Sequence, residues 1–490
     1  MILAPPRGVF EEYVAERSFV LRWFADPAPY LRARWIWLRA LGVIFFSAFY
    51  SLWFQIHGLI GPRGILPARD YLLYAKQAVG AKAYWLIPSM LWFDASRGAL
   101  TLLVAAGLAA SLCIVCNLWP RVTIAVAAIC FLSFVSAAQD FSGYQSDGML
   151  LEAAFFSLFL APRGPRPGLG AHDPPTRAAV FLLQWEWFRI YFESGLVKIL
   201  SGEEQWRNLT AMDKYYENGP LPSWLGWYVQ QWPHGFHAFS AAATLLIELV
   251  VVWLLFVPMR RVKQLAFLLT TPLQIGIILT ANYAFLNYLV LALGFLLLED
   301  GHAPAVEPRL RQVQRVVLPL GFAISILMFL APRSAPVQLV APSRIVNNYG
   351  LFAVMTRARY EIEFQGTRDG RTWVAYPFRY KPQDPRRAPG LYAPYQPRFD
   401  WNLWFASLGS VSSDPWVMSV EQRLLDNEPD VLRLFAGNPF PGKPPVAVRA
   451  VLWQYWFTTP AERARTHAWW NRRLIGDYAP TLGAQSSGLQ

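Results

Sequence analysis

The sequence predicts a polytopic α-helical membrane protein of about nine transmembrane helices, followed by a C-terminal extramembrane α+β domain. Three observations predict this class. Of the 490 residues, 54% are hydrophobic and only 16% are charged, whereas about 25% of a soluble domain is charged. Several long stretches contain no Asp, Glu, Lys or Arg, among them 40–62, 98–120 and 264–298. After Pro336 this pattern ends, and apolar and polar residues begin to alternate as they do in strands.

The charge-free intervals and further apolar segments place the membrane helices, because a helix needs about 20 apolar residues to cross a bilayer core. The interval 264–298 is long enough for two crossings, with a tight turn at Ala281-Asn282-Tyr283. The segment 147–161 is the shortest, and the parity of the count depends on it. The predicted spans lie near residues 36–57, 98–118, 122–139, 147–161, 178–200, 236–257, 263–281, 283–298 and 314–331.

Basic residues in the short loops predict the orientation. If the N-terminus is cytoplasmic, the inner segments carry Lys or Arg and the outer short loops near 140–146 and 281–283 carry none, as the positive-inside rule requires. An odd number of spans then puts the C-terminal domain outside, in the periplasm for a bacterial inner membrane or in the lumen for an endoplasmic reticulum membrane. The inner basic residues are Arg32, Arg34, Arg39, Arg121, Arg163, Arg166, Arg177, Arg260, Arg261, Lys263, Arg309, Arg311 and Arg315.

The formal charge of +12 does not indicate nucleic-acid binding, because no Lys/Arg-rich run marks a phosphate-binding patch. The basic residues are instead expected to orient the protein in a lipid bilayer, which is its expected partner. No metal site and no cofactor are predicted, since only His234 and His237 lie close together and zinc needs three or four convergent ligands. Cys113 and Cys116 form a C-x-x-C spacing within an apolar stretch, without the neighbouring charge that activates a thiol.

The predicted organisation is a helical transmembrane domain over 1–335, the α+β domain over 336–480 and a disordered tail over 481–490. Alternation on both sides of Asp369-Gly370 predicts a β-hairpin, since this pair favours a tight turn. A capping Thr followed by Pro, Thr459-Pro460, predicts the start of a last helix. Between the hairpin and that helix we expect a Pro/Arg/Tyr-rich loop at 382–400, two helices near 415–436 and a strand at 446–457.

Ionisable residues inside membrane spans are costly and by default indicate a functional site. Glu186, Arg189 and Glu193 are spaced i, i+3, i+7, so they share a helix face on which Arg189 can neutralise both carboxylates. One interpretation is a structural network that fixes helix register, with Lys198 reaching the interface. The other is a polar cavity in which Lys198 acts as a general base beside Glu193 or Glu186. The predicted network comprises Asp147, Glu152, Glu186, Arg189, Glu193, Lys198 and Glu248.

The predicted loop of the exposed domain is rich in Arg, Tyr and Trp, the composition of binding hot spots. An equal alternative is a loop whose aromatic side chains pack on the hairpin while Arg398 pairs with Asp400. The binding candidates are Arg386, Arg387, Tyr392, Tyr395, Arg398, Asp400, Trp401 and Trp404.

Several sequence blocks occur in a fixed order between about residues 140 and 457. They are Gln145-Ser146-Asp147-Gly148-x-x-x-Glu152, Asn348-Tyr349-Gly350-x-Phe352, Glu361-Ile362-Glu363-Phe364-Gln365-Gly366-Thr367, Phe378-x-x-Lys381-Pro382, Ala393-Pro394-Tyr395-Gln396-Pro397-Arg398-Phe399-Asp400-Trp401-x-x-Trp404-Phe405-Ala406, Asn438-Pro439-Phe440 and Val448-Arg449-Ala450. With these blocks the sequence resembles the lipase maturation factor family.

The resemblance implies a non-enzymatic membrane factor whose exposed C-terminal domain helps exported client proteins, lipases among them, to fold or assemble. The eight binding candidates then become candidates for contact with clients. Animal members of the family reside in the endoplasmic reticulum, whereas this Arg-, Ala- and Pro-rich composition is typical of a GC-rich bacterium and favours the inner membrane.

A shorter stretch, Phe192-Glu193-Ser194-Gly195-Leu196-Val197-Lys198 with Trp206 downstream, is similar to a helix of vitamin K-dependent γ-glutamyl carboxylases and of related horizontally transferred transmembrane (HTTM) domains. In the carboxylases a Lys that matches Lys198 is the presumed base. This likeness implies an alternative function, an integral membrane enzyme that uses an intramembrane lysine as general base.

Overall fold

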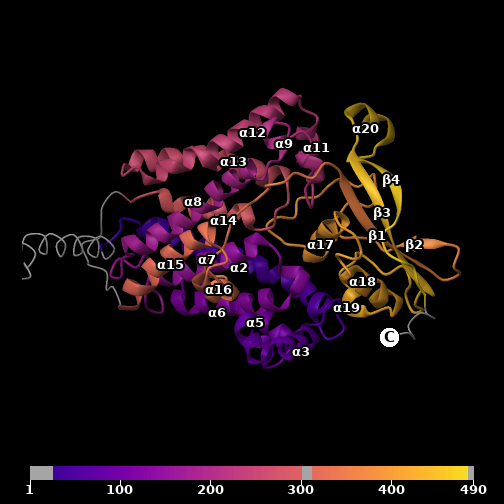
Figure 1. Ribbon diagram of the computed structural model, residues 1–490, viewed down its shortest axis with the longest axis horizontal. Helices are drawn as coiled ribbons and strands as arrows, with labels where there is room; N and C mark the ends of the chain where they lie inside the picture. The colour runs from indigo at the N-terminus through magenta and orange to yellow at the C-terminus, as the bar shows by residue number, and fades with distance from the viewer. Residues whose placement is uncertain (1–25, 301–311, 484–490) are drawn as a thin grey trace, which may run out of the picture.

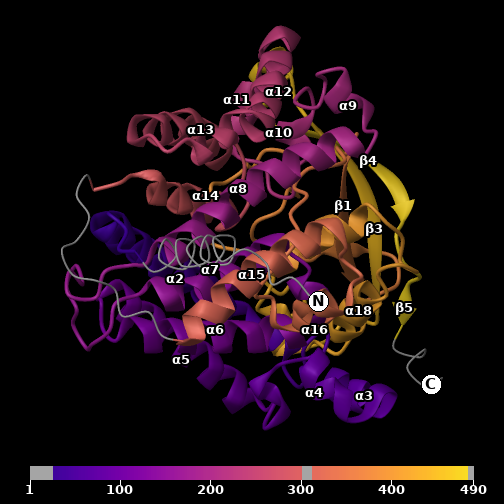
Figure 2. The same ribbon diagram turned by 60° about the vertical axis from the view of Figure 1, so that its left-hand side comes forward.

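The computed structural model describes residues 26–300 and 312–483. Its helices form one large assembly, and a small β-sheet stands at one end of it in both views of the molecule (Figures 1 and 2). The expected inner residues Arg309 and Arg311, and the last seven residues of the expected tail, lie outside the described ranges.

Every segment predicted to cross the membrane is helical. Close approach of the helices depends on small residues: a Cβ added at Gly107 of α5 would lie 2.3 Å from the Phe49 ring of α2, as at glycine contacts between membrane helices. The principal helices are α2 (Leu31–Ile60), α5 (Arg97–Val115), α6 (Pro120–Ala137), α7 (Gln145–Leu160), α8 (Arg177–Leu200), α12 (His234–Leu249), α13 (Arg260–Thr280), α14 (Leu286–Gly294) and α15 (Gln312–Leu330).

Five helices in the described ranges are long and apolar enough to cross a bilayer, namely α2, α5, α6, α13, and α12 together with its continuation η4 (Val251–Phe256). A sixth is added if α15 and the segment Ala335–Ser343, bent by 113° from it, count as one span. The predicted number of nine is therefore not confirmed. Helix α7 has 16 residues and α14 only nine, and α8 carries several charged residues.

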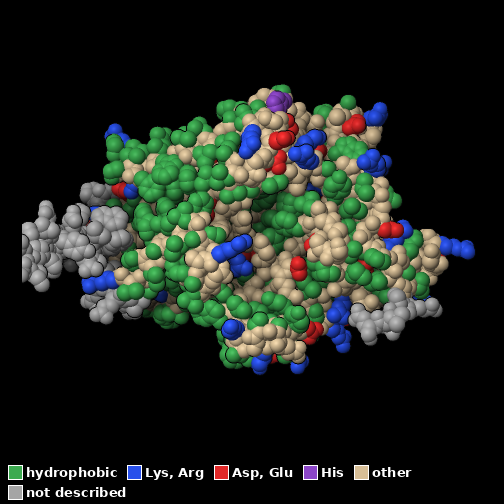
Figure 3. All heavy atoms as spheres, in the orientation of Figure 1, with side chains coloured by type: hydrophobic (Ala, Val, Ile, Leu, Met, Phe, Trp, Pro, Cys, Tyr) green, Lys and Arg blue, Asp and Glu red, His purple; other side chains and the backbone are tan. Residues whose placement is uncertain are grey.

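The outer surface of the helical part indicates where lipid lies. In the most apolar stretches of α12 and α13, only 22% and 17% of the residues are buried within the protein. Such large exposed apolar surfaces need a non-aqueous neighbour. Hydrophobic side chains cover much of the helical part in Figure 3, while most charged side chains gather toward the end with the sheet. The protein is thus an integral membrane protein.

Short helices connect these elements. They are α3 (Ala68–Val79), η1 (Gly80–Lys82), α4 (Ala83–Leu86), η2 (Met90–Trp92), η3 (Gln139–Ser142), α9 (Glu204–Arg207), α10 (Tyr215–Asn218), α11 (Trp224–Gln230), η5 (Phe295–Leu297), α16 (Ala335–Val340) and η6 (Ala341–Ser343).

The sheet has the antiparallel order β2-β1-β3-β4, and β5 pairs with the start of β3. The predicted hairpin is confirmed, because β1 and β2 pair across the turn at Gly370, whose φ is +71°. The longest ladder joins β1 to β3 and places Ile362 opposite Leu452. The strands are β1 (Arg359–Thr367), β2 (Trp373–Ala375), β3 (Ala447–Phe457), β4 (Trp470–Asp477) and β5 (Leu482–Gly483).

Two expectations for this part of the chain are corrected. The predicted loop does not extend to residue 400, because α17 (Arg398–Ser407) begins directly after Pro397 with Asp400 in its first turn, where a carboxylate interacts well with the helix dipole. The predicted tail is shortened, because β5 adds to β3 within it.

The helices expected near 415–436 are α18 (Trp416–Leu425) and α19 (Pro429–Leu432), and the last helix is α20 (Pro460–Thr466). Helix α20 begins with the expected Thr459 cap, which forms a capping box with Glu462.

Strand β1 contains charged residues that are buried. Glu361 and Glu363 alternate with apolar residues, yet both are buried. Glu361 pairs with Arg359 and, at 2.8 Å, with the Lys381 ammonium, while the Arg472 guanidinium lies 3.6 Å from Glu363. Buried charges are retained when they are paired in this way.

Candidate functional site

The polar residues predicted within the membrane separate into three pairings, and each lies at a different place in the helical part. The first joins α7 to α17. The Arg398 guanidinium donates to both Asp147 oxygens at 2.8 Å and to the Phe141 carbonyl at 2.8 Å. The central carbon of this guanidinium, Cζ, lies 4.9 Å from the centre of the Phe134 ring. Both charged side chains are almost completely buried, so this bidentate pair fastens the C-terminal domain to the bundle.

The second pairing surrounds Arg189 of α8. Its guanidinium contacts Glu152 of α7 at 2.8 Å and Glu193 one turn along α8 at 2.9 Å, and it donates to the Asn347 carbonyl. The same carboxylates bind the chain after α16. Glu152 accepts from the Asn347 N–H at 2.8 Å and the Tyr349 hydroxyl at 2.7 Å, and Glu193 accepts from the Tyr349 N–H at 2.8 Å.

The close approach of the 347–350 segment to α7 explains a glycine in the first sequence block. A Cβ added at Gly148 would lie 2.5 Å from the Asn347 side-chain oxygen. The Asn347 amide donates to the Gly148 carbonyl at 2.9 Å, and the Gly350 N–H donates to Gln145 at 3.0 Å. The sequence blocks that begin at Gln145 and Asn348 therefore meet at one interface, between α7 and the segment that enters the C-terminal domain.

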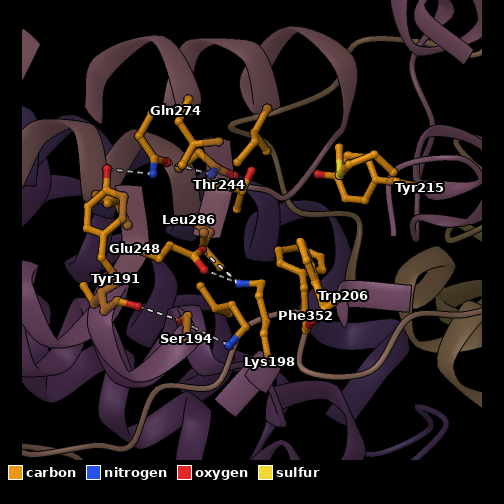
Figure 4. A pocket seen from close by; sticks show the side chains of 17 residues that line it. Tyr191, Ser194, Lys198, Trp206, Tyr215, Thr244, Glu248, Gln274, Leu286 and Phe352 are labelled. Atoms are coloured by element: carbon orange, nitrogen blue, oxygen red, sulfur yellow. Dashed lines mark hydrogen bonds and ion pairs between the residues drawn. The ribbon is translucent and has the colours of Figure 1, made fainter. Parts of the chain in front are cut away.

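The third pairing lines a small cavity of about 70 Å³ between α8, α12, α13 and α14 (Figure 4). The Lys198 ammonium donates to both Glu248 oxygens at 2.8 Å and lies 5.1 Å from the Trp206 ring centre. On the far wall, Gln274 donates to the Tyr191 hydroxyl at 2.8 Å. The cavity is mainly apolar, and its charged pair is already satisfied.

Glu186 does not belong to any of these pairings. Its side chain is fully buried, and neither carboxyl oxygen has a hydrogen-bond partner among the described residues. The expectation that Arg189 neutralises both neighbours on its own helix is therefore corrected: Arg189 takes Glu193 and, in place of Glu186, Glu152 from the adjacent helix. Helical spacing could not show this, because Glu152 comes from a different part of the sequence.

These geometries favour the structural interpretation of the network over a general-base site. The structural interpretation also expected Lys198 to reach the membrane interface, and this part of it is wrong. Lys198 is 1% exposed and is paired with Glu248. A general base needs a free lone pair directed at a substrate proton, whereas this ammonium is held by a carboxylate on two sides.

The binding candidates do not form one exposed patch, contrary to expectation. Arg398, Asp400, Trp401 and Trp404 are buried because α17 packs between the sheet and the bundle. The Trp401 ring lies 5.3 Å from the ring of Tyr144. The alternative interpretation of an Arg398–Asp400 ion pair is also wrong, since Arg398 pairs with Asp147 of α7.

The rest of the predicted loop is more accessible. Arg386 and Arg387 are exposed, while Tyr392 and Tyr395 are half-buried. Tyr395 contacts the Tyr380 ring at 5.4 Å, and Asp400 accepts the N–H groups of Tyr380 and Lys381 at 3.2 Å. Burial raises the pKa of Asp400 to about 6 despite these two hydrogen bonds.

Some residues that hold the site together were not predicted. Asn282 lies in the turn after α13, and its side chain donates to the Gly390 carbonyl at 2.9 Å and accepts from the N–H of Tyr392. Gln55 of α2 donates to the Gln396 carbonyl at 2.9 Å. In each case the sequence showed a single side-chain amide within an apolar stretch, which indicated a polar contact. The partner of that contact could not be predicted from the sequence.

The fold and these contacts define a class: an integral membrane protein whose helical bundle holds a C-terminal sheet domain through buried ion pairs. The model of the lipase maturation factor transmembrane domain matches residues 32–305, and that of the lipase maturation factor C-terminal domain matches residues 345–480. The chain belongs to the lipase maturation factor family.

Individual relatives resemble the chain over most of its length. It is 32% identical to lipase maturation factor 1 of Bos taurus, over 93% of this chain and 91% of the relative. The identity is 31% to lipase maturation factor 2 of Gallus gallus, over 93% and 82%, and 31% to lipase maturation factor 1 of Homo sapiens, over 92% and 88%. No solved structure matches the chain. The shorter likeness to carboxylase and HTTM helices is not supported by these comparisons.

Proposed function

We propose that the protein is a membrane-embedded maturation factor that assists the folding or assembly of exported, lipase-like proteins on the outer side of the membrane. The observation that carries the proposal is that the similarity to lipase maturation factors includes both the helical bundle and the sheet domain. The buried contacts between these parts support a single working unit, in which the bundle holds the sheet domain at a fixed position on the membrane surface.

The distribution of charge supports the proposed orientation, with the N-terminus cytoplasmic and the C-terminal domain periplasmic in a bacterial inner membrane. Basic residues of three predicted inner segments meet at one place: Arg34 donates to the Asp173 carbonyl at 2.7 Å, and Arg121 and Arg163 lie 3.4 and 3.7 Å from the Asp173 carboxylate. The predicted outer short loops instead contact the C-terminal domain, through Phe141 and Asn282.

Contact with clients is proposed for the accessible part of the loop, which comprises Arg386, Arg387, Tyr392 and Tyr395. Guanidinium groups next to tyrosine rings can bind both the carboxylates and the apolar side chains of an incompletely folded protein. The buried members of the original set, such as Trp404, are assigned to holding the domain in place.

The proposal is tested by site-specific photocrosslinking in cells that co-express a secreted lipase. A photoreactive amino acid at position 386 or 387 is expected to capture the lipase while it is folding, and the same residue at buried position 404 is expected to capture none. The yield of active secreted lipase is measured in parallel. If the yield is the same with and without the chain, a maturation role for that lipase is contradicted.

A further inference from the structure

A pocket of about 530 Å³ lies where the last turns of α2 meet the C-terminal domain. One wall consists of membrane-helix side chains, including Tyr50, Trp53 and Phe54, and the other of Arg379 and Arg433 from the sheet domain. Of the proposed client contacts, Tyr395 alone lines this pocket, and the three buried pairings described above do not use it.

The α2 wall is apolar and exposed. Tyr50, Trp53 and Phe54 are 44–55% exposed although they belong to a helix apolar enough to span a bilayer. Their rings continue toward the middle of the helix: Phe46 stacks on Tyr50 at 5.9 Å, and Tyr50 meets Phe54 at 5.1 Å. The pocket therefore opens onto an apolar aromatic strip long enough to contact an acyl chain, and aromatic side chains of this kind gather at membrane interfaces.

The opposite wall offers positive charge. The Arg379 guanidinium donates to the Arg433 carbonyl at 3.2 Å, which holds the two arginines side by side. Among the described residues, Asp430 is the only carboxylate within ion-pair distance of the Arg433 guanidinium, at 3.5 Å, and Asp430 is also paired with Arg97. One carboxylate is thus shared by two guanidinium groups, and a phosphate placed between Arg379 and Arg433 would complete their pairing.

The same pocket also contains groups that suit a cation. Asp400 lines it, together with the rings of Tyr380 and Tyr395. A carboxylate beside tyrosine faces attracts an ammonium group by charge and by cation–π interaction. A simple aromatic belt at the membrane surface would explain the tyrosines and tryptophan, but not a buried carboxylate and two arginines around one cavity.

We propose that this pocket binds the headgroup of one phospholipid in which a phosphate is joined to a primary amine, with its acyl chains along the aromatic strip of α2. The phosphate lies between Arg379 and Arg433, and the ammonium group lies against Asp400 and the two tyrosine rings. The bound lipid fills the junction between α2 and the C-terminal domain.

The test uses the full chain purified in detergent and titrated with dioleoyl phosphatidylethanolamine or with dioleoyl phosphatidylglycerol, with bound lipid counted by native mass spectrometry. The two lipids share acyl chains and phosphate and differ in the amine. Charge-assisted hydrogen bonds of this kind change affinity about tenfold, so we expect about tenfold tighter binding of the ethanolamine lipid.

Three variants separate the parts of the site. The double substitution Arg379→Gln with Arg433→Gln is expected to weaken binding of both lipids about tenfold or more, whereas Asp400→Asn is expected to remove only the preference for the amine. Arg473→Gln, at an exposed arginine on β4 outside the pocket, is the matched control and should bind like the unchanged chain. Equal binding of the two lipids by the unchanged chain, or unaltered binding by the double variant, would overturn the proposal.

Discussion

Arg398 and Asp147 are separated by 251 positions in the sequence and share two hydrogen bonds inside the folded protein. A buried ion pair is costly to break, because removal of one partner leaves the other charge without compensation in a poorly solvating environment. The same physical argument applies to Lys198 and Glu248. At the scale of single residues, these buried pairs mark where distant parts of the chain meet.

Asp147→Asn is expected to lower the stability of the protein by about 3–5 kcal/mol, since it leaves the Arg398 guanidinium buried without the carboxylate that balances its charge. Thermal unfolding in detergent measures this effect. The double variant Asp147→Leu with Arg398→Met should be markedly more stable than Asp147→Asn, because neither charge remains. Equal losses in all variants would show that the two residues do not interact energetically.

Glu421 of α18 is expected to make the folding stability of the protein depend on pH. Its carboxyl is buried, and burial raises its pKa to about 8, against the smaller lowering effect of the Ala450 backbone. A carboxyl whose folded pKa exceeds its unfolded value of about 4.3 favours folding in its neutral form. Its stabilising effect is complete below the unfolded pKa and is lost as the pH rises to about 8.

Glu421→Gln is therefore expected to flatten the fall in unfolding temperature between about pH 4.3 and pH 8, where one titrating group changes stability by up to about 1.4 kcal/mol per pH unit. Unfolding is measured across this range in one detergent. Asp426→Asn, at an exposed carboxylate just after the same helix, is the control and should leave the slope unchanged. A slope unaltered by Glu421→Gln would contradict the assignment.

At the scale of elements, helix α2 contacts the C-terminal domain so closely that one position tolerates no side chain. A Cβ added at Gly58 would lie 2.6 Å from the Asp430 carbonyl of α19 and 2.8 Å from the Leu434 side chain. Backbone atoms cannot rotate away from such a contact. The end of α2 and α19 must therefore separate if a larger residue is placed there.

Gly58→Ala is expected to destabilise the protein by about 1–3 kcal/mol through overpacking. Gly276→Ala in α13 is the matched control, because a Cβ there would meet no atom within 4 Å and alanine is the better helix former by about 0.5–1 kcal/mol. Limited proteolysis should show faster cleavage around residue 434 in the first variant only. The prediction fails if both variants unfold at the same temperature.

Local sequence patterns were sufficient to predict most helices and strands, but not to predict which charged residues pair in the candidate site. Apolar stretches located the helices, and Asp369-Gly370 and Thr459-Pro460 located a hairpin and a helix start. Helix α17 was missed because the Pro-rich segment before it indicates a loop. The network could be assembled only in part, because the second partner of Arg189 and the partner of Asp147 lie on other elements, and tertiary contacts decide which charges pair.

At the scale of the whole molecule, the charged ends of the bundle support one orientation in the membrane. Arg34 and Arg121, which lie beside Asp173, belong to the first turns of α2 and α6, whereas the opposite end of α2 meets α19 of the C-terminal domain. Positively charged loops are retained on the cytoplasmic side during insertion. The sheet domain is accordingly expected outside, where exported proteins fold.

This orientation is tested with single cysteines in a chain whose Cys113, Cys116 and Cys130 are replaced by alanine. Ser412→Cys, at an exposed position of the sheet domain, should react with a membrane-impermeant maleimide in intact cells. Pro165→Cys, at an exposed position near the Asp173 cluster, should react only after the membrane is opened. The reverse labelling pattern would contradict the orientation.

The ion pair between Asp147 and Arg398 also sets an order of events during synthesis. The ribosome delivers Asp147 to the membrane long before residue 398 has been made, so its carboxylate must wait without its partner at a position where exposed charge is costly. The helical bundle can complete this ion pair only after the C-terminal third of the chain has been synthesised. A chain cut short by a premature stop codon would keep this acidic group unmatched, a defect that membrane proteases could recognise as the signature of an unfinished protein.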